Sequence, residues 1–297
     1  VALTHVVAAA ERGTRQLRLA SVAGIAVGQY LRLTQYDEPT RGLIKEMQGG
    51  IEPQSDQIDY VAEELGDPRK VQDWLFKVQA IHGDSVVLDR PLRTKVSLDW
   101  GPQIHTHQPT VREVGVEGLT FEFLGRPKKP HLTEEGFNAV SFKSVTDAWV
   151  RNVEIIDSDY GINARAFVYN SQFEDVTFRA VKRASTSPSC HHGLNVSILS
   201  QDNLFNRFRF NTYCEHDVTV EAYANGNVFS NGVFARATLD HHKAAPYENL
   251  FTNLHTVDGS VLYKSGGAKN RGPNAGVREA FWGITAGNSL ATLPSKS

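Results

Sequence analysis

The sequence predicts an all-β protein in which a small β module with a long loop, residues 1–107, precedes a parallel β-helix with a C-terminal tail, residues 108–297. Two triplets recur at nearly regular steps: Gly-apolar-Asn from Gly136, Gly161 and Gly193, and Asn-apolar-Phe from Asn203, Asn227 and Asn249. A degenerate fourth copy of the first triplet begins at Asp217, and the common step of about 24 residues is typical of solenoids. The alternation of apolar and polar residues between turns predicts short strands, which must stack coil upon coil to bury a face.

Composition argues against several classes of partner, although it does not exclude a local basic groove. The 297 residues include 31 Lys and Arg against 33 Asp and Glu, a formal net charge of −2. This balance argues against a dedicated nucleic-acid or anionic-membrane surface. No stretch approaches the roughly 18 apolar residues of a membrane span, and no basic-then-apolar leader is present. Because the chain opens at Val1 and has Met47 as its one methionine, we expect a processed protein that is secreted or periplasmic.

In the first 107 residues apolar and polar residues alternate as they do in strands, but no pattern repeats every 24 residues. Expected strands contain Gln16–Leu19, Gly28–Leu33, Trp74–Val78 and the hairpin-like Ile81–Asp89. Between them Pro39–Arg69 is rich in Gly, Asp, Glu and Pro, which predicts a long loop. That loop either overhangs a groove or is a surface excursion, and the sequence leaves both open.

The coils are expected from about Val111 to about Ile284, with very little helix. The strands at Gly136, Gly161 and Gly193 should be neighbours once an insertion of about eight residues, Lys182 to Ser189, is removed. Cys190 and Cys214, the only cysteines, lie one period apart. Their Cα atoms should therefore be about 4.4–6.8 Å apart, as a disulfide or a pair of stacked thiols.

The module ending in Val86–Leu92, the coil Val116–Phe121 and the asparagine-laddered coils resemble the right-handed parallel β-helix proteins of the pectate-lyase-like superfamily. The resemblance implies a right-handed coil and activity on polysaccharides. That superfamily contains lyases, inverting glycosidases, epimerases, esterases and depolymerases, so the fold does not choose the reaction. The glycosidase signature of paired aspartates, Gly-His-Gly and Arg-Ile-Lys is unmatched, its nearest phrases being Asp157-Ser158-Asp159 and His191-His192-Gly193.

Strand parity predicts what the coils display outward. A polar strip with Tyr, His, Arg, Glu and Asn suits sugar binding. The first expected outward row contains Asn138, Asn163, Asn195 and Thr219. The second row contains Val140, Arg165, Ser197 and Glu221. The corner before these strands contains Glu135, Tyr160, His192 and His216.

Histidines gather in three clusters at matching coil positions: Cys190-His191-His192-Gly193, Glu215-His216-Asp217 and Asp240-His241-His242. The 24-residue register places His192 over His216 and then Asp240. Imidazole can take or return a proton near neutrality. A metal set such as His191, His216, Asp240 and His241 is the alternative, but a straight ladder does not converge tetrahedrally, so we assign no metal ligand.

These residues suit cleavage of a uronic-acid polysaccharide by β-elimination, which needs a neutralised carboxylate, a base and an acid. The predicted catalytic residues are His192, His216, Asp240, Tyr160 and Arg165. The predicted substrate-binding residues are Asn163, Asn195, Glu221, His191, His241 and Lys264. His192 or His216 would be the base and Tyr160 the acid, and Arg165 and Lys264 would neutralise the carboxylate. No cofactor is required, although a divalent cation could serve.

Two other functions remain open. An inverting glycoside hydrolase needs two carboxyl groups about 6.5–9.5 Å apart, for which Asp159, Glu215, Glu221 and Asp240 are candidates. A polysaccharide-binding β-helix without activity would display aromatic side chains, of which Tyr223 is the clear outer one. The sequence does not decide between a monomer and a homo-oligomer.

Overall fold

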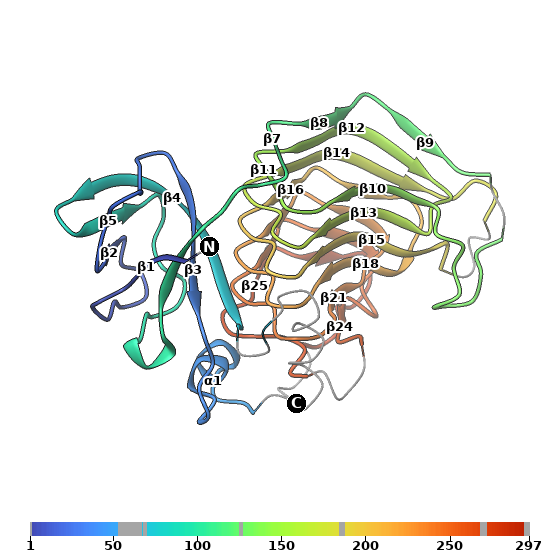
Figure 1. Cartoon of the computed structure of the whole chain (residues 1–297). Helices are drawn as coiled ribbons and strands as arrows, with labels where there is room; N and C mark the ends of the chain where they lie inside the picture. The colour runs from blue at the N-terminus through green and yellow to red at the C-terminus, as the bar shows by residue number, and fades with distance from the viewer. Residues whose placement is uncertain are drawn as a thin grey trace. The chain divides into compact units, whose positions relative to one another are not determined.

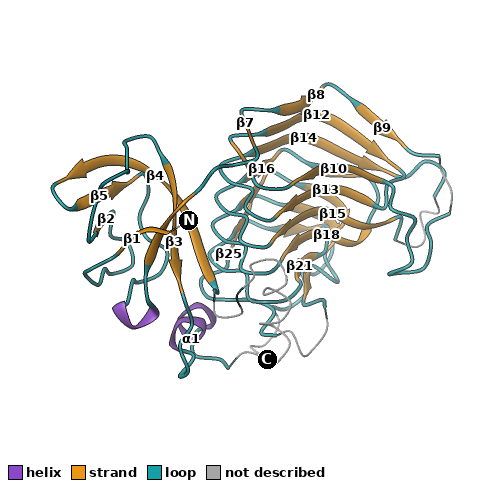
Figure 2. Ribbon diagram, viewed as in Figure 1, coloured by secondary structure: helices purple, strands orange, loops and turns teal. Residues whose placement is uncertain are grey.

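The computed structural model describes residues 2–52, 67, 70–124, 127–183, 188–267 and 272–293. Contacts divide the chain into two compact units, Val1–Pro109 and Thr110–Ser297 (Figure 1). Strands dominate both units (Figure 2), and the only helices in the described ranges are α1 (Gly42–Gln48) and the 3-10 turn η1 (Leu98–Trp100). The prediction of an all-β chain is therefore confirmed.

The first unit is an antiparallel sheet of six strands in the order β1-β6-β3-β4-β5-β2. Its strands are β1 (Ala2–His5), β2 (Gln16–Arg18), β3 (Tyr30–Gln35), β4 (Gln72–His82), β5 (Ser85–Leu88) and β6 (Gln103–Thr106). Apolar residues at alternate positions, such as Leu33, Trp74 and Phe76, form its core. The strands lie where the alternation of apolar residues predicts them.

The segment predicted as a long loop is partly helical. Helix α1 begins shortly after Pro39 and buries Leu43, Ile44 and Met47. Apolar residues at spacings of three and four form one helix face, and this short pattern overrides the Gly- and Pro-rich composition around it. The remaining part of the predicted loop, residues 53–66 and 68–69, lies outside the described residues.

The second unit is a parallel β-helix whose front sheet has the order β10-β13-β15-β18-β21-β24. Its strands are β10 (Asn138–Phe142), β13 (Tyr160–Arg165), β15 (Cys190–Ser197), β18 (Cys214–Val220), β21 (Leu239–His241) and β24 (Tyr263–Lys264). Every neighbouring pair is parallel. The strands at the three Gly-apolar-Asn triplets are thus adjacent, as predicted.

The rear sheet completes each coil with two strand segments. In the second and third coils a single long strand, β12 (Trp149–Ile156) or β14 (Gln172–Arg179), provides both segments. Elsewhere the segments are separate strands: β8 (Gly115–Glu117), β9 (Thr120–Glu122), β16 (Leu204–Asn206), β17 (Arg209–Phe210), β19 (Val228–Ser230), β20 (Val233–Arg236), β22 (Leu250–Thr252), β23 (His255–Asp258), β25 (Ala280–Trp282) and β26 (Thr285–Ala286). The short β7 (Val111–Arg112) and β11 (Val145–Thr146) pair at a corner.

Ladders of identical residues hold the coils together. Five phenylalanine rings stack along the axis with centroids 4.4, 4.8, 4.9 and 5.1 Å apart: Phe173, Phe205, Phe229, Phe251 and Phe281. Buried asparagines close one corner, because Asn203 Nδ2 donates to Asn227 Oδ1 and Asn227 Nδ2 donates to Asn249 Oδ1, each at 2.9 Å. The ladders satisfy buried polar groups coil by coil, so the period read from the asparagines is the physical repeat.

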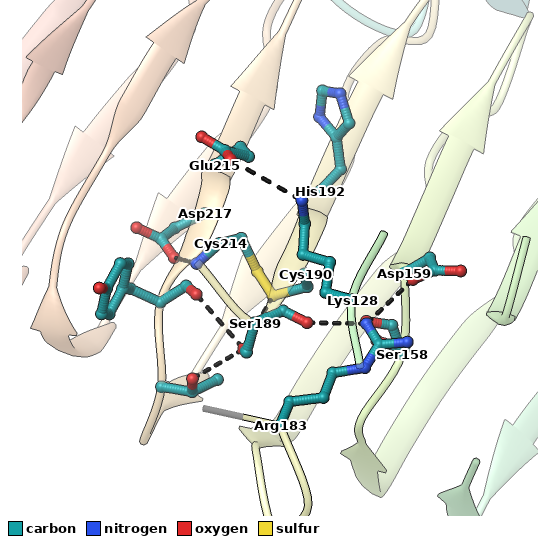
Figure 3. Close-up of a disulfide and its surroundings, with 12 residues drawn as sticks. Lys128, Ser158, Asp159, Arg183, Ser189, Cys190, His192, Cys214, Glu215 and Asp217 are labelled. Atoms are coloured by element: carbon teal, nitrogen blue, oxygen red, sulfur yellow. Dashed lines mark hydrogen bonds and ion pairs between the residues drawn. A yellow bond between two sulfur atoms is a disulfide. The ribbon is translucent and has the colours of Figure 1, made fainter. Parts of the chain in front are cut away.

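The register agrees with the prediction in the middle coils and departs from it at both ends. Cys190 pairs with Cys214 and His192 with His216, and the two cysteines form a disulfide with Cα atoms 4.5 Å apart (Figure 3). Asp240, however, pairs with Thr219 instead of standing over His216, because the corner before β21 is shorter than those before it.

At the first coil, Ser141 instead of Asn138 pairs with Asn163, so the predicted outer rows shift there. The physical reason is that Gly136 differs from the later glycines. Its φ is 90° and nothing lies within 4 Å of its missing Cβ, which makes it a loop glycine outside the strand ladder. Val140 is accordingly buried and takes no part in an outward row.

The predicted insertion lies between β13 and β15, where Tyr160 pairs with His192 across a step of 32 residues. Residues 184–187 of it lie outside the described residues. At its ends the buried Arg183 donates to the carbonyl oxygens of Ser158 and Ser189 at 2.8 Å and lies 2.9 Å from Asp159 Oδ1 (Figure 3). Among the described residues, no helix is long and apolar enough to cross a membrane.

Candidate active site

A repeated β-bulge at the start of the front-sheet strands aims two consecutive side chains outward. The backbone amides of His191 and His192 both donate to the Asp159 carbonyl, at 2.8 and 3.3 Å. One coil earlier, the amides of Asp159 and Tyr160 both donate to the Phe137 carbonyl. Two residues of one strand therefore face a single residue of its neighbour, which is the geometry of a β-bulge. A bulge interrupts the alternation of side chains between the two faces of the sheet.

The glycine after each bulge is required by close packing. A Cβ on Gly161 would lie 2.2 Å from the Phe178 ring, and one on Gly193 would lie 2.3 Å from the Phe210 ring. Both glycines therefore face the core, while the residues before them face out. The triplet glycines thus allow the core to close beneath the displaced histidines.

Five imidazoles lie together on this surface, and we call them the histidine cluster: His131, His191, His192, His216 and His242. His192 occupies the centre, with its ring centroid 4.4 Å from that of His191 and 4.6 Å from that of His216. The Tyr160 ring packs on its other side, also at 4.6 Å. Tyr160, His192 and His216, which span 56 positions of the chain, are in this way gathered on the neighbouring strands β13, β15 and β18.

Two carboxylates orient the rings. Asp240 Oδ2 lies 2.7 Å from Nδ1 of both His216 and His242, and its Oδ1 accepts the Gly266 amide at 2.6 Å. Glu134 Oε1 lies 3.3 Å from His191 Nδ1. The Nδ1 of His192 has a neutral partner instead, the Thr219 hydroxyl at 2.8 Å.

Burial lowers the pKa of His191, His192 and His216 and so favours their neutral imidazoles. It lowers the pKa of His192 well below 6.5, an effect to which His216 and His191 add. The pKa of His191 is lowered by burial to about 4, although Glu134 opposes the shift. Burial raises the pKa of Tyr160 above its ordinary value, and Glu221 adds to this. Burial alone would raise the pKa of Asp240, but the hydrogen bonds from His216 and His242 outweigh it and lower that pKa. The site therefore combines neutral bases with a protonated phenol.

The predicted outer row continues across the sheet as Ser141, Asn163, Asn195, Thr219, Asp240 and Lys264. Asn195 Nδ2 donates to Asn163 Oδ1 at 3.3 Å. Lys264, the residue hardest to place from sequence, pairs with Asp240 and donates to the Glu215 carbonyl at 2.9 Å. Both asparagines and the lysine thus lie beside the cluster.

Arg165 and Glu221 lie further along the same strands. Arg165 is exposed and pairs with Ser197 in the ladder. Glu221 is buried, and its Oε2 lies 3.4 Å from the Nζ of Lys243. Their charges reach Tyr160, whose pKa the arginine lowers and the glutamate raises.

Two expectations about outward residues are wrong. His241 points into the solenoid, where it packs against Phe251 and Phe281 and lies 3.2 Å from the buried Glu279. The shortened corner before β21 exchanges the roles of His241 and His242, so the metal set containing His241 is not assembled. Tyr223 is fully buried and cannot serve as an exposed sugar platform.

The sequence reasoning missed a segment that joins the cluster from outside the repeat. His131 and Glu134 precede β10, and the His131 ring lies 4.4 Å from that of His191. Lys128, from the same segment, lies 3.4 Å from Glu134 Oε1. It also lies 3.8 Å from Glu215 Oε1 (Figure 3). No periodic signal marks these residues. The only feature of the sequence that could have indicated them is the spacing of His131 and Glu134, three positions apart and close to Lys128.

The carboxylates considered for a hydrolase are held by other groups. Asp159 is buried, pairs with Arg183 and accepts two backbone amides at 2.9 and 3.0 Å. Asp240 is held by two imidazoles, and Glu221 lies beside Lys243. Glu215 lies 3.8 Å from Lys128. Each of the four carboxyl groups is therefore already engaged by another group of the protein.

A cavity of about 420 Å³ lies at the start of β18 and β24. Tyr213, Glu215, Arg236, Tyr263 and Lys264 are among its lining residues. The Arg236 guanidinium lies 5.4 Å from the centre of the Tyr213 ring. The lining of this corner cavity thus combines two cations and two aromatic rings with the carboxyl groups of Glu215 and Asp217.

No protein-family model matches this sequence, and no curated protein sequence does. Among solved structures, the chain is similar to the Gp54 tailspike of the Acinetobacter baumannii bacteriophage AP22, solved in complex with an A. baumannii capsular saccharide. That match has a TM-score of 0.40 and 9% identity and covers 99% of this chain and 60% of the tailspike.

Two further matches are tailspikes of Pseudomonas phages. The gp49 protein of phage LKA1 gives a TM-score of 0.31 and 11% identity over 99% of this chain and 64% of its own. The gp61 tailspike of phage phi297 gives a TM-score of 0.28 and 11% identity. That match covers 86% of this chain and 57% of the tailspike. The chain thus spans less than two thirds of each tailspike. These identities and TM-scores are too low to transfer a function.

Proposed function

We propose that this chain cleaves an acidic, uronic-acid-containing polysaccharide by β-elimination, with His192 as the base and Tyr160 as the acid. The observation that carries the proposal is the contact between a neutral imidazole and a protonated phenol, with ring centroids 4.6 Å apart, on the outward face of the front sheet. The Thr219 hydroxyl holds His192 Nδ1, which leaves Nε2 as the nitrogen that reacts.

The chemistry follows from these positions. His192 Nε2 removes the proton beside the uronate carboxylate, and the released electron pair forms the new carbon–carbon double bond. The bond to the leaving oxygen breaks, and the Tyr160 hydroxyl donates its proton to that oxygen. The imidazolium and the phenolate then return to their starting states by proton exchange with water. His216, held by Asp240, supports the His192 ring from the adjacent strand.

Neutralising the substrate carboxylate acidifies the proton that the base removes. Lys264 is the best-placed cation, because it lines the corner cavity and lies in the same row as Thr219 and Asp240. Arg236 in the same cavity, Arg165 further along the strand and the amides of Asn163 and Asn195 provide further donors to sugar oxygens.

We also propose that the protein works in an oxidising compartment, secreted or periplasmic. The Cys190–Cys214 disulfide lies directly beside the histidine strands and supports this, because disulfides persist where thiols are not kept reduced. The resemblance of the coils to the pectate-lyase-like superfamily agrees with an exported polysaccharide enzyme.

The test is incubation with a panel of uronic-acid and neutral polysaccharides, following ultraviolet absorbance of the unsaturated product together with new reducing ends. The proposal predicts that both signals rise together on a uronic-acid polymer. Reducing ends without absorbance would indicate a hydrolase. Retention of a polysaccharide without either signal would indicate a binding protein.

A further inference from the structure

We infer that His131, His191 and His216 form a binding site for one divalent transition-metal ion of the Zn²⁺ class, distinct from the acid–base pair His192 and Tyr160. One ring nitrogen of each histidine lies within 4.8 Å of those of the other two. Imidazole is a preferred ligand of Zn²⁺, Ni²⁺ and Cu²⁺. Three histidines with an open fourth position are also the ligand set of several zinc enzymes.

Carboxylates lie on the Nδ1 side of all three rings. The Nδ1 atoms of His131 and His191 lie 3.9 and 3.3 Å from Glu134 Oε1. His216 Nδ1 lies 2.7 Å from Asp240 Oδ2. Because Nδ1 faces a carboxylate in all three rings, we expect Nε2 to be the nitrogen that binds the ion. Metal-bound histidines commonly donate their other N–H to a carboxylate in this way.

His216 Nε2 gives an independent indication. It is buried and has no hydrogen-bond partner among the residues that the structure describes. A buried ring nitrogen without a partner is costly unless a proton donor or a cation satisfies it. This atom lies on the strand next to His191, so the ion would bridge two fixed strands and the segment that carries His131.

Binding requires only a modest movement. Zn²⁺–nitrogen bonds of about 2.0–2.1 Å place tetrahedral ligand atoms about 3.3 Å apart, closer than the present spacing of up to 4.8 Å. His191 and His216 are held by the bulge and the strand register, whereas His131 lies outside the sheet with 44% of its side chain exposed. We therefore expect His131 to close onto the other two.

A second set in the same cluster, His216, Asp240 and His242, fits an ion less well. Its nitrogen–oxygen distances of 2.7 Å are those of hydrogen bonds and are too short for the edge of a coordination tetrahedron. Asp240 also holds the Gly266 amide through its other oxygen. An ion there would disrupt three existing contacts.

The experiment is titration of the chelator-treated protein with Co²⁺, followed by visible absorption, and with Zn²⁺ in competition with a chromophoric chelator. We expect one ion per chain. His131→Ala should weaken Zn²⁺ binding at least about a hundredfold, and Glu134→Gln about tenfold to a hundredfold. His242→Ala should change it less than about threefold. His255→Ala is the matched control, because that exposed histidine lies on the rear sheet.

Melting temperatures establish that the variants are folded, which His131→Ala should be because its residue is exposed. Absence of stoichiometric binding by the wild-type protein would overturn the inference. Binding retained in His131→Ala but lost in His242→Ala would also overturn it and place the ion at the second set. These readouts do not involve polysaccharide, so failure of the metal site and failure of the proposed elimination are distinguishable.

Discussion

Replacing Gly193 with alanine perturbs the point where the core closes beneath the histidine cluster. The added Cβ would lie 2.3 Å from Phe210 Cε1 and 2.6 Å from the Asp217 carbonyl oxygen, where ordinary contact begins near 3.4 Å. The overlap is therefore about 1 Å on two sides, and one side is backbone that cannot rotate away. Overpacking of this kind costs about 1–3 kcal/mol.

A second effect opposes this loss of stability. Alanine restricts the conformations of the unfolded chain, which stabilises the folded protein by about 0.4–1 kcal/mol at a compatible position. The packing loss is larger, so we expect the free energy of unfolding to fall by about 2 kcal/mol. Urea denaturation followed by circular dichroism and fitted by linear extrapolation measures it. A change below about 0.5 kcal/mol would refute the reasoning, since a clash with rigid neighbours cannot be that small.

A double-mutant cycle with Phe210→Ala identifies the clash. Removing the ring opens space on one side of the new Cβ, while the Asp217 carbonyl remains on the other. The double variant should therefore be less destabilised than the sum of the two single variants, by about 1 kcal/mol. Strict additivity would show that the ring does not limit the space at Gly193.

Three further predictions concern charge and covalent structure. Asp240→Asn should lower turnover of the cleaved polysaccharide about tenfold or more, because an amide cannot accept from both His216 and His242; unchanged turnover in a folded variant would exclude that role. The double variant Cys190→Ala/Cys214→Ala should lose about 3 kcal/mol of unfolding free energy in urea, as expected for a crosslink that closes 24 residues. Stability should fall as the pH is lowered from about 6.5 towards about 4, because the unfolded His191 binds a proton before the buried one does. Melting temperatures at pH 7 and pH 5 measure this, and a rise on acidification would contradict it.

The coil interior could be predicted because its determinants repeat. Asn203, Asn227 and Asn249 bond to one another at every step, so the spacing in the sequence is the spacing of the coils. Cys190 and Cys214 likewise fix the register of the two strands that carry His192 and His216. Wherever the same chemical requirement recurs in each coil, the period could be read from the sequence.

The departures come from contacts that do not repeat. A corner three residues shorter than the period moved Asp240 to the level of Thr219 and turned His241 inward. The bulge that turns both His191 and His192 outward contradicts simple alternation. His131 and Glu134 belong to a segment outside the repeat, and they reach the cluster through tertiary contacts that no period describes.

The most direct test of the central claim is the rate of unsaturated-product formation by the wild-type protein, His192→Ala and His255→Ala on a uronic-acid polymer that the wild type cleaves. The account predicts a loss of at least about a hundredfold for His192→Ala, the usual scale of acid–base catalysis, with its melting temperature retained. His255→Ala should keep the wild-type rate. An unchanged rate in folded His192→Ala would contradict the assignment of the base to the histidine cluster.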